Sequence, residues 1–147
     1  MSLPMPAALQ ALLSLGTVVT DGAWGTQLQS LGLPGGDPPD FWNLSHPDRV
    51  REVAARYVAA GSRVILTNTF RSNAIALAAH GAADKAAELN AAGVRISRLA
   101  AEGHALVFAS IGPSGKMLAA GDVSEEDLSR AFDEQARACK EAGADAI

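Results

Sequence analysis

The chain has 147 residues, of which 48% are hydrophobic and 19% charged, and its formal net charge is −4. These values are typical of one globular domain, and the mild negative charge gives no reason to expect binding to nucleic acid or to an anionic membrane surface. No apolar run reaches the roughly 18 residues that a membrane span needs, and a single cysteine excludes an internal disulfide bond. We therefore expect a cytoplasmic protein without a nucleic-acid or membrane partner.

The first part of the chain predicts a short helix, a strand and an open turn. Residues 6–15 are apolar and alanine-rich, which favours a short helix. Residues 17–21 form a β-branched run that ends in Asp21 and predicts the first strand. Gly22 and Gly25 follow, and we expect them to let the backbone turn sharply or approach a ligand.

A loop and an amphipathic helix come next. We expect one or two helical turns over residues 26–31, whereas residues 32–40 are too rich in glycine and proline for a regular element. Residues 45–48 read Ser-His-Pro-Asp, which is typical of a helix start with the Ser45 hydroxyl as its cap. The apolar stripe that follows at helical spacing consists of Val50, Val53, Ala54, Tyr57 and Val58.

Three more strands are predicted, and helices separate them. Residues 64–67 form an apolar run typical of a strand buried on both faces, residues 105–109 form the third strand, and residues 144–147 begin a fourth. Helices are expected over residues 72–79, from residue 84 to about residue 100, and from residue 124 to residue 143. The buried side expected for the middle helix consists of Leu89, Ala92, Ile96, Leu99 and Ala100.

The alternation of strand and helix implies a parallel sheet with right-handed crossovers. A doubly wound sheet and a (β/α)8 barrel both satisfy this pattern. A complete (β/α)8 barrel needs about 250 residues, so this α/β chain would supply only about half of one. Because the sequence stops at the start of a fourth strand, we expect it to be a fragment of a larger domain.

The candidate binding residues lie in the turns after the first two strands. Parallel α/β folds bind ligands at the carboxyl ends of their strands, where Asp21 and the Asn68-Thr69 pair are expected to lie. Taken alone, Asp21-Gly22 is more typical of a turn in which the acid bonds its own backbone. The functional alternative is that Asp21 holds the ammonium group of an amino acid while the N–H groups of residues 22–25 hold its carboxylate.

The remaining motifs give no catalytic residue and no metal ligand. Residues 110–116 lack the glycine and the Ser or Thr that a phosphate-binding loop requires at fixed positions. The three histidines share no ligand spacing and lie near helix ends, where we expect them to act as caps. Cys139 is expected to be a small buried thiol within a helix.

Five segments occur in an order and spacing that carry a resemblance: DGAWGT at 21–26, WNLSHP at 42–47, TNTF at 67–70, SIGPSG at 110–115 and EAGAD at 141–145. Together they resemble the homocysteine S-methyltransferase domain family, which includes the homocysteine-binding module of methionine synthases. The resemblance implies a (β/α)8 barrel that binds homocysteine and zinc at its C-terminal rim and methylates the sulfur to give methionine. It also implies that residues 1–147 are the N-terminal part of this barrel, roughly its first half, and end at the start of strand 4. The substrate-binding residues that it implies are Asp21, Gly22, Ala23, Gly25, Asn68 and Thr69.

The sequence also departs from the family pattern. The three zinc-binding cysteines of the family lie in the second half of the barrel, and Cys139 matches none of them. We therefore expect zinc only in the complete family domain and expect this chain to be inactive by itself. The sequence does not identify the methyl donor. Members of the family use methylfolate with cobalamin, S-methylmethionine, S-adenosylmethionine or betaine.

The expected partners are homocysteine and either the missing C-terminal half-barrel or a second copy of the chain. One alternative function is a non-catalytic half-barrel that self-associates and binds at most a small amino acid. Another is an enzyme for a different amino or keto acid, with Asp21 as its base.

Overall fold

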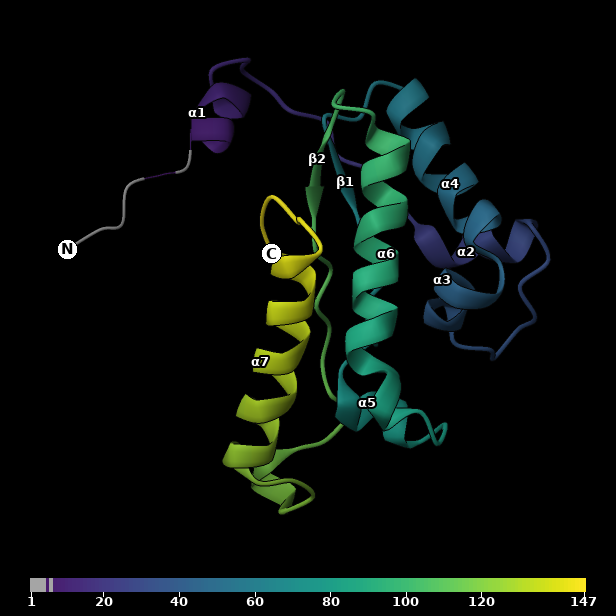
Figure 1. Ribbon diagram of the computed structural model, residues 1–147, viewed down its shortest axis with the longest axis vertical. Coiled ribbons are helices and arrows are strands. Elements are labelled where there is room, and N and C mark those ends of the chain that lie inside the picture. The colour runs from purple at the N-terminus through teal and green to yellow at the C-terminus, as the bar shows by residue number, and fades with distance from the viewer. Residues whose placement is uncertain (1–4, 6) are drawn as a thin grey trace.

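A small parallel sheet forms the centre of the computed structural model, which describes Met5 and residues 7–147. Strands β1 (Val64–Leu66) and β2 (Leu106–Phe108) pair in parallel. Single parallel bridges extend this sheet on both sides, from Thr20 to β1 and from Ala146 to β2. Four segments therefore lie side by side in the order of the sequence (Figure 1), and the predicted parallel pairing is confirmed.

The strands are shorter than predicted, and the predicted first and fourth strands are reduced to single bridges. Each of these outer segments pairs with the sheet on one side only among the described residues, which limits its ladder. Backbone hydrogen bonds attach both outer segments. In the first segment, Val19 O accepts from the N–H of Arg63 (2.8 Å), and the N–H of Asp21 donates to Val64 O (3.0 Å). In the last segment, Ala146 O accepts from the N–H of Ala109 (2.8 Å), and the N–H of Asp145 donates to Val107 O (2.8 Å).

Helices cover the outer face of the sheet, with α6 between α4 and α7 (Figure 1). The helices are α1 (Ala7–Leu13), α2 (Trp24–Ser30), α3 (Trp42–Ser45), α4 (Pro47–Ala59), α5 (Ala74–Ala78), α6 (Ala86–Ala101) and α7 (Glu125–Glu141). Three short 3-10 helices lie between them, namely η1 (Pro39–Phe41), η2 (Ala83–Lys85) and η3 (Leu118–Ala120). None of the helices in the described part of the chain has the length and apolarity to cross a membrane.

The helical periodicity of the sequence predicts the buried face of α4 correctly but not that of α6. On α4, Val50, Val53 and Ala54 are buried, as predicted. On α6, Leu99 is 64% exposed, so its predicted burial is wrong. The buried arc of α6 is centred on a different face because it includes the polar side chains of Asn90 and Ser97, and Leu99 lies opposite that arc.

Two predicted helix starts also differ from the structure. Ser45 does not cap α4; it ends α3, and its hydroxyl donates to Phe41 O (3.1 Å). Helix α2 begins at Trp24, two residues earlier than expected, so it includes Gly25. The start of α7 is as predicted, since the Ser124 hydroxyl accepts a hydrogen bond from the N–H of Asp127 (3.0 Å).

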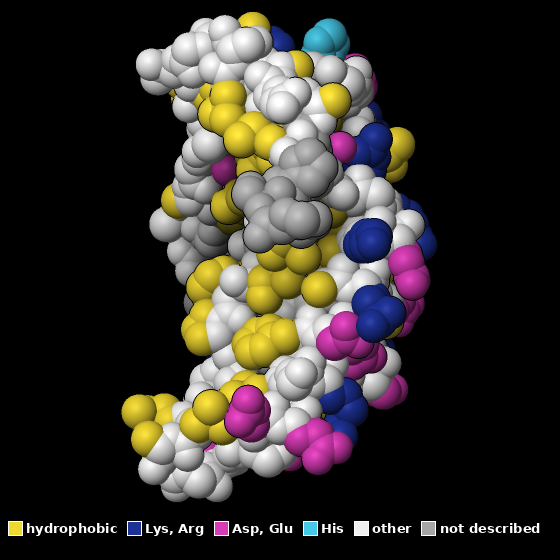
Figure 2. Space-filling view, turned by 90° about the vertical axis from the view of Figure 1, so that its left-hand side faces the viewer, with side chains coloured by type: hydrophobic (Ala, Val, Ile, Leu, Met, Phe, Trp, Pro, Cys, Tyr) yellow, Lys and Arg dark blue, Asp and Glu magenta, His cyan; other side chains and the backbone are white. Residues whose placement is uncertain are grey.

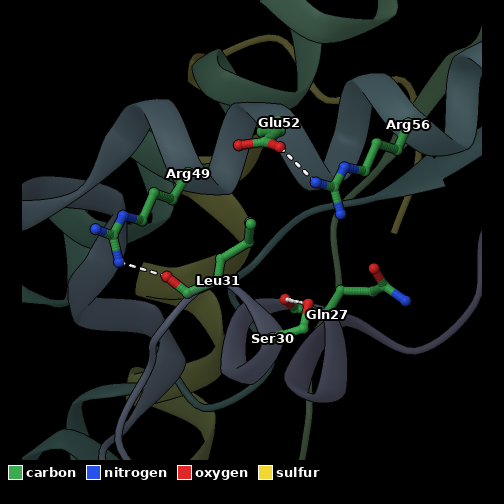
Figure 3. A network of polar contacts seen from close by, with 6 residues as sticks. All are labelled: Gln27, Ser30, Leu31, Arg49, Glu52 and Arg56. Carbon is green, nitrogen blue, oxygen red and sulfur yellow. Dashed lines mark hydrogen bonds and ion pairs between the residues drawn. The ribbon is translucent and has the colours of Figure 1, made fainter.

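Helix α2 is held against α4 by polar contacts (Figure 3). The Arg49 guanidinium, on α4, donates to the Leu31 carbonyl at the end of α2. The same guanidinium lies 5.3 Å from the ring centroid of Trp42, in a cation–π arrangement. These contacts fix α2, and with it the turn that connects the first sheet segment to α2.

The opposite face of the sheet is apolar and only partly covered. A hollow of about 390 Å³ lies between α1 and this face, and we call it the inner hollow. Its lining includes Leu9, Leu12, Val18, Val64, Leu66 and Phe108. Figure 2, which shows the side of the molecule on which α1 lies, has hydrophobic side chains gathered near its middle.

Candidate ligand site at the strand ends

The Asp21 carboxylate joins the first sheet segment to β1. Its Oδ2 atom accepts hydrogen bonds from the N–H of Leu66 (2.7 Å) and from the indole N–H of Trp24 (2.7 Å). Its Oδ1 atom is buried and has no hydrogen-bond partner among the described residues. A buried carboxylate oxygen without a donor is costly, so this atom is a natural acceptor for a ligand donor.

The glycine turn after Asp21 differs from the predicted one. Neither Gly22 nor Gly25 has the positive φ of a sharp glycine turn. Glycine is required at position 22 for space, because a Cβ atom there would lie 3.3 Å from the Tyr57 hydroxyl oxygen. That hydroxyl donates to Ala23 O (2.9 Å), which ties the turn to α4.

A cavity of about 350 Å³ lies beside this turn, at the carboxyl ends of the sheet segments. We call it the rim cavity; its lining includes Gly22, Trp24, Gly25, Asp40, Asn68 and Arg71. The structure thus brings together three residues that the sequence singled out from two separate turns. Asp21 lines the neighbouring inner hollow instead, while Ala23 and Thr69 do not line the rim cavity.

The side chains of Asn68 and Thr69 are engaged with the protein itself. Asn68 is 5% exposed, and its amide N–H group donates to Pro39 O (2.8 Å) and Asn43 Oδ1 (2.9 Å). Thr69 is fully buried, and its hydroxyl donates to Ser110 O (2.9 Å). Asn68 lines the rim cavity and Thr69 does not, and the contact of both residues with a substrate stays a prediction.

Asp40 is a site residue that the sequence reasoning missed. It is 2% exposed, and its Oδ1 atom accepts from the Ser72 hydroxyl (2.5 Å) and from the N–H of Arg71 (3.1 Å). Burial raises the pKa of the Asp40 carboxyl above its ordinary value, and these hydrogen bonds and the Arg71 charge offset part of that rise. The available signal was an acid at the end of the proline-rich loop, next to the aromatic pair Phe41-Trp42.

Among Met5 and residues 7–147, no three His, Cys, Asp or Glu side chains come together as possible metal ligands. Cys139 is fully buried on α7, as predicted, and burial raises the pKa of its thiol to about 11. His46 precedes α4 without a side-chain capping bond; its ring packs on Trp42 with centroids 4.7 Å apart. His80 packs edge-on against Phe41, with centroids 6.0 Å apart.

Comparison with known proteins agrees with this arrangement. The sequence profile of the homocysteine S-methyltransferase family matches residues 18–147. The chain belongs to the homocysteine S-methyltransferase family. The methionine synthases of Mycobacterium leprae and Mycobacterium tuberculosis are 32% and 31% identical to this family member over 144 and 150 residues, with 88% and 92% of the chain covered.

The same family appears among solved structures. One similar structure is the homocysteine methyltransferase MmuM from Escherichia coli in its metallated form. It superposes on this chain with a TM-score of 0.80 and 27% sequence identity, and the match covers 94% of this chain. The chain spans 55% of MmuM and 12% of each methionine synthase. The family prediction is confirmed, and the parallel sheet with its outer helices is consistent with part of a barrel.

Proposed function

We propose that this chain forms the amino-acid-binding part of a site that methylates the thiol of homocysteine to give methionine. The relatives named above support this type of reaction. The observation that carries the proposal for this chain is the buried, unpartnered Oδ1 atom of Asp21 at the end of a parallel sheet segment. Gly22 and Trp24, its near neighbours in sequence, line the rim cavity.

In this proposal, the Asp21 carboxylate receives the ammonium group of homocysteine. Its Oδ2 atom is already held by Leu66 and Trp24, so Oδ1 is oriented without further ordering of the side chain. A hydrogen bond between charged groups contributes about 1.5–3 kcal/mol. The backbone of residues 22–25 would face the carboxylate of the same ligand, which matches both charges of a zwitterion.

The thiol itself needs activation that this chain does not supply. A free thiol has a pKa of about 8.5, so little of it is thiolate at neutral pH. Zinc would deprotonate it, but no group of described residues fits a zinc site, and we derive no metal step from this chain. We therefore propose that the metal ligands and the determinants of the methyl donor belong to the rest of the family domain, and that this chain alone is inactive.

We further propose that residues 1–147 are the N-terminal part of the family barrel and that a complementary half-barrel completes it. Among the described residues, Thr20 and Ala146 each pair with one neighbouring strand only, and the inner hollow is apolar. Open edges and an apolar inner face favour association with further strands. A cytoplasmic location agrees with the free thiol of Cys139.

Calorimetric titration of the chain with three small molecules tests the proposed ligand contacts. L-homocysteine and L-homoserine, which lacks the thiol, should bind with similar affinity, while 3-aminopropanethiol, which lacks the carboxylate, should bind more weakly. Asp21→Asn should weaken homocysteine binding by about 10- to 100-fold, the loss expected for one charge-assisted hydrogen bond.

Asp145→Asn is the matched control, because Asp145 also accepts a hydrogen bond from a strand N–H, that of Val107 (2.8 Å), but lines neither the rim cavity nor the inner hollow. This variant should bind homocysteine like the wild type. Equal affinities for Asp21→Asn and the wild type would contradict the assignment of Asp21. Binding of any small amino acid with equal affinity would favour the non-catalytic alternative, and formation of methionine by the chain alone would contradict its proposed inactivity.

A further inference from the structure

The loop between β1 and α5 is held by side chains that come from three other helices. Three buried amides donate hydrogen bonds to its backbone carbonyls: Asn43 to Asn68 O (2.7 Å), Asn90 to Ser72 O (2.7 Å) and Gln135 to Thr69 O (2.9 Å). These amides lie on α3, α6 and α7, and in Figure 1 the helices α6 and α7 run side by side past the loop and α5. The conformation of the loop is thus set by tertiary contacts.

Gln135 is the most unusual of these three residues. It is fully buried, and its amide N–H group donates both to Thr69 O and to Asn90 Oδ1 (3.1 Å). Its Oε1 atom is buried without a hydrogen-bond partner among the described residues. An apolar side chain of similar volume would avoid that unsatisfied acceptor, but it would also take a donor from two buried acceptors, Thr69 O and Asn90 Oδ1. The amide is therefore used to hold these two atoms.

Gln135 and Asn90 act together. The Oδ1 atom of Asn90 accepts from Gln135 and, at 3.5 Å, from the Cys139 thiol, which leaves the Asn90 amide N–H group directed to Ser72 O and Ala86 O. Removal of the Gln135 amide would therefore take away one of two donors to the Thr69 carbonyl, the other being the N–H of Ser72 (3.1 Å), and would also loosen the orientation of Asn90.

The loop that these amides hold forms one wall of the rim cavity, to which it contributes Asn68, Phe70 and Arg71. We infer that Gln135 is a positioning residue, which acts through the Thr69 carbonyl and through Asn90 to hold residues 68–72 in the conformation that forms this wall. The inference rests on the proposed function, because a fixed wall matters only if the rim cavity takes a ligand. Preorganised walls of this kind lower the entropic cost of binding.

Amide hydrogen exchange tests the inference without a ligand. In Gln135→Met, which keeps the volume, the Arg71 and Ser72 amides should exchange about 3- to 10-fold faster relative to the other core amides, as expected for the loss of the hydrogen bond to the Thr69 carbonyl. Comparison with the other core amides separates this local effect from a fall in global stability. Ala131→Gly is the control on the same helix: it should lower the melting temperature through the cost of glycine in a helix and leave the exchange of these two amides relative to the other core amides unchanged.

Homocysteine affinity gives the second readout and should fall by a similar factor in Gln135→Met but not in Ala131→Gly. Unchanged exchange at Arg71 and Ser72 in Gln135→Met would overturn the inference, as would faster exchange with unchanged homocysteine affinity. If the wild type does not bind homocysteine, the proposed function fails, and the exchange measurement still decides whether Gln135 holds the loop.

Discussion

At the scale of single residues, two aspartates at the strand ends use their carboxylates in different ways. Asp21 divides its two oxygens between the protein and the proposed ligand. Asp40 is almost fully buried, and its Oδ1 atom accepts hydrogen bonds from the N–H of Arg71 and the Ser72 hydroxyl. In the proposed site Asp21 therefore binds the ligand, whereas Asp40 holds the loop on which Asn68 lies.

The raised pKa of Asp40 predicts how its contribution to stability depends on pH. The folded state binds the proton of this carboxyl more tightly than the unfolded chain, whose value is the ordinary 3.8. The favourable contribution is therefore present below pH 3.8 and is lost as the pH rises through the raised folded pKa. Urea unfolding at several pH values should show the wild type losing stability relative to Asp40→Asn over this range, and parallel curves would contradict this expectation.

Asp40→Ala serves as the companion variant at neutral pH. It leaves the N–H of Arg71 and the Ser72 hydroxyl without their acceptor, which should cost about 1–3 kcal/mol of unfolding free energy. Asp40→Asn keeps an acceptor for both donors and should lose less.

At the scale of elements, the closest approach between α6 and the strand ends occurs at Gly93. A Cβ atom at this position would lie 2.6 Å from Thr69 Cγ2 and 2.8 Å from Asn43 Nδ2. Alanine normally stabilises a helix interior by about 1 kcal/mol relative to glycine. Here we expect the clash to prevail, so Gly93→Ala should lower the unfolding free energy by about 1–3 kcal/mol in chemical denaturation.

Gly25→Ala is the matched control for this prediction. Gly25 is also helical and lacks a positive φ, but a Cβ atom there would meet nothing within 4 Å. This variant should be as stable as the wild type or slightly more stable. A Gly93→Ala protein with the stability of Gly25→Ala would show that α6 can move away from the loop at little cost.

At the scale of the whole molecule, the open sheet edges predict association. Val19 lies in the first edge segment and is 61% exposed. We expect sedimentation velocity to show concentration-dependent association of the chain, and Val19→Lys to reduce it, because a charge on an edge strand opposes further pairing. A single monomeric species at all concentrations would contradict self-association of the chain through these edges.

The regular parts of this molecule could be predicted from the sequence, and the long-range contacts could not. The parallel pairing of the strands, the buried residues of α4 and the Ser124 cap follow from local patterns, so they were predicted correctly. The burial of Asp40 and the role of Gln135 depend on partners 31 to 66 residues away, which no local pattern indicates. The face of α6 was misjudged at Leu99 because polar residues take part in its buried arc.

The two oxygens of Asp21 connect ligand occupancy to the cohesion of the sheet. The Oδ2 atom accepts a hydrogen bond from the N–H of Leu66 at the end of β1, while the Oδ1 atom has no partner among the described residues. A bound ammonium group would supply a donor to the Oδ1 atom, and a ligand that binds only the folded state raises the melting temperature by mass action. Bound substrate would thus hold the first strand segment to β1 more firmly, and the same segment would be held less firmly when the site is empty.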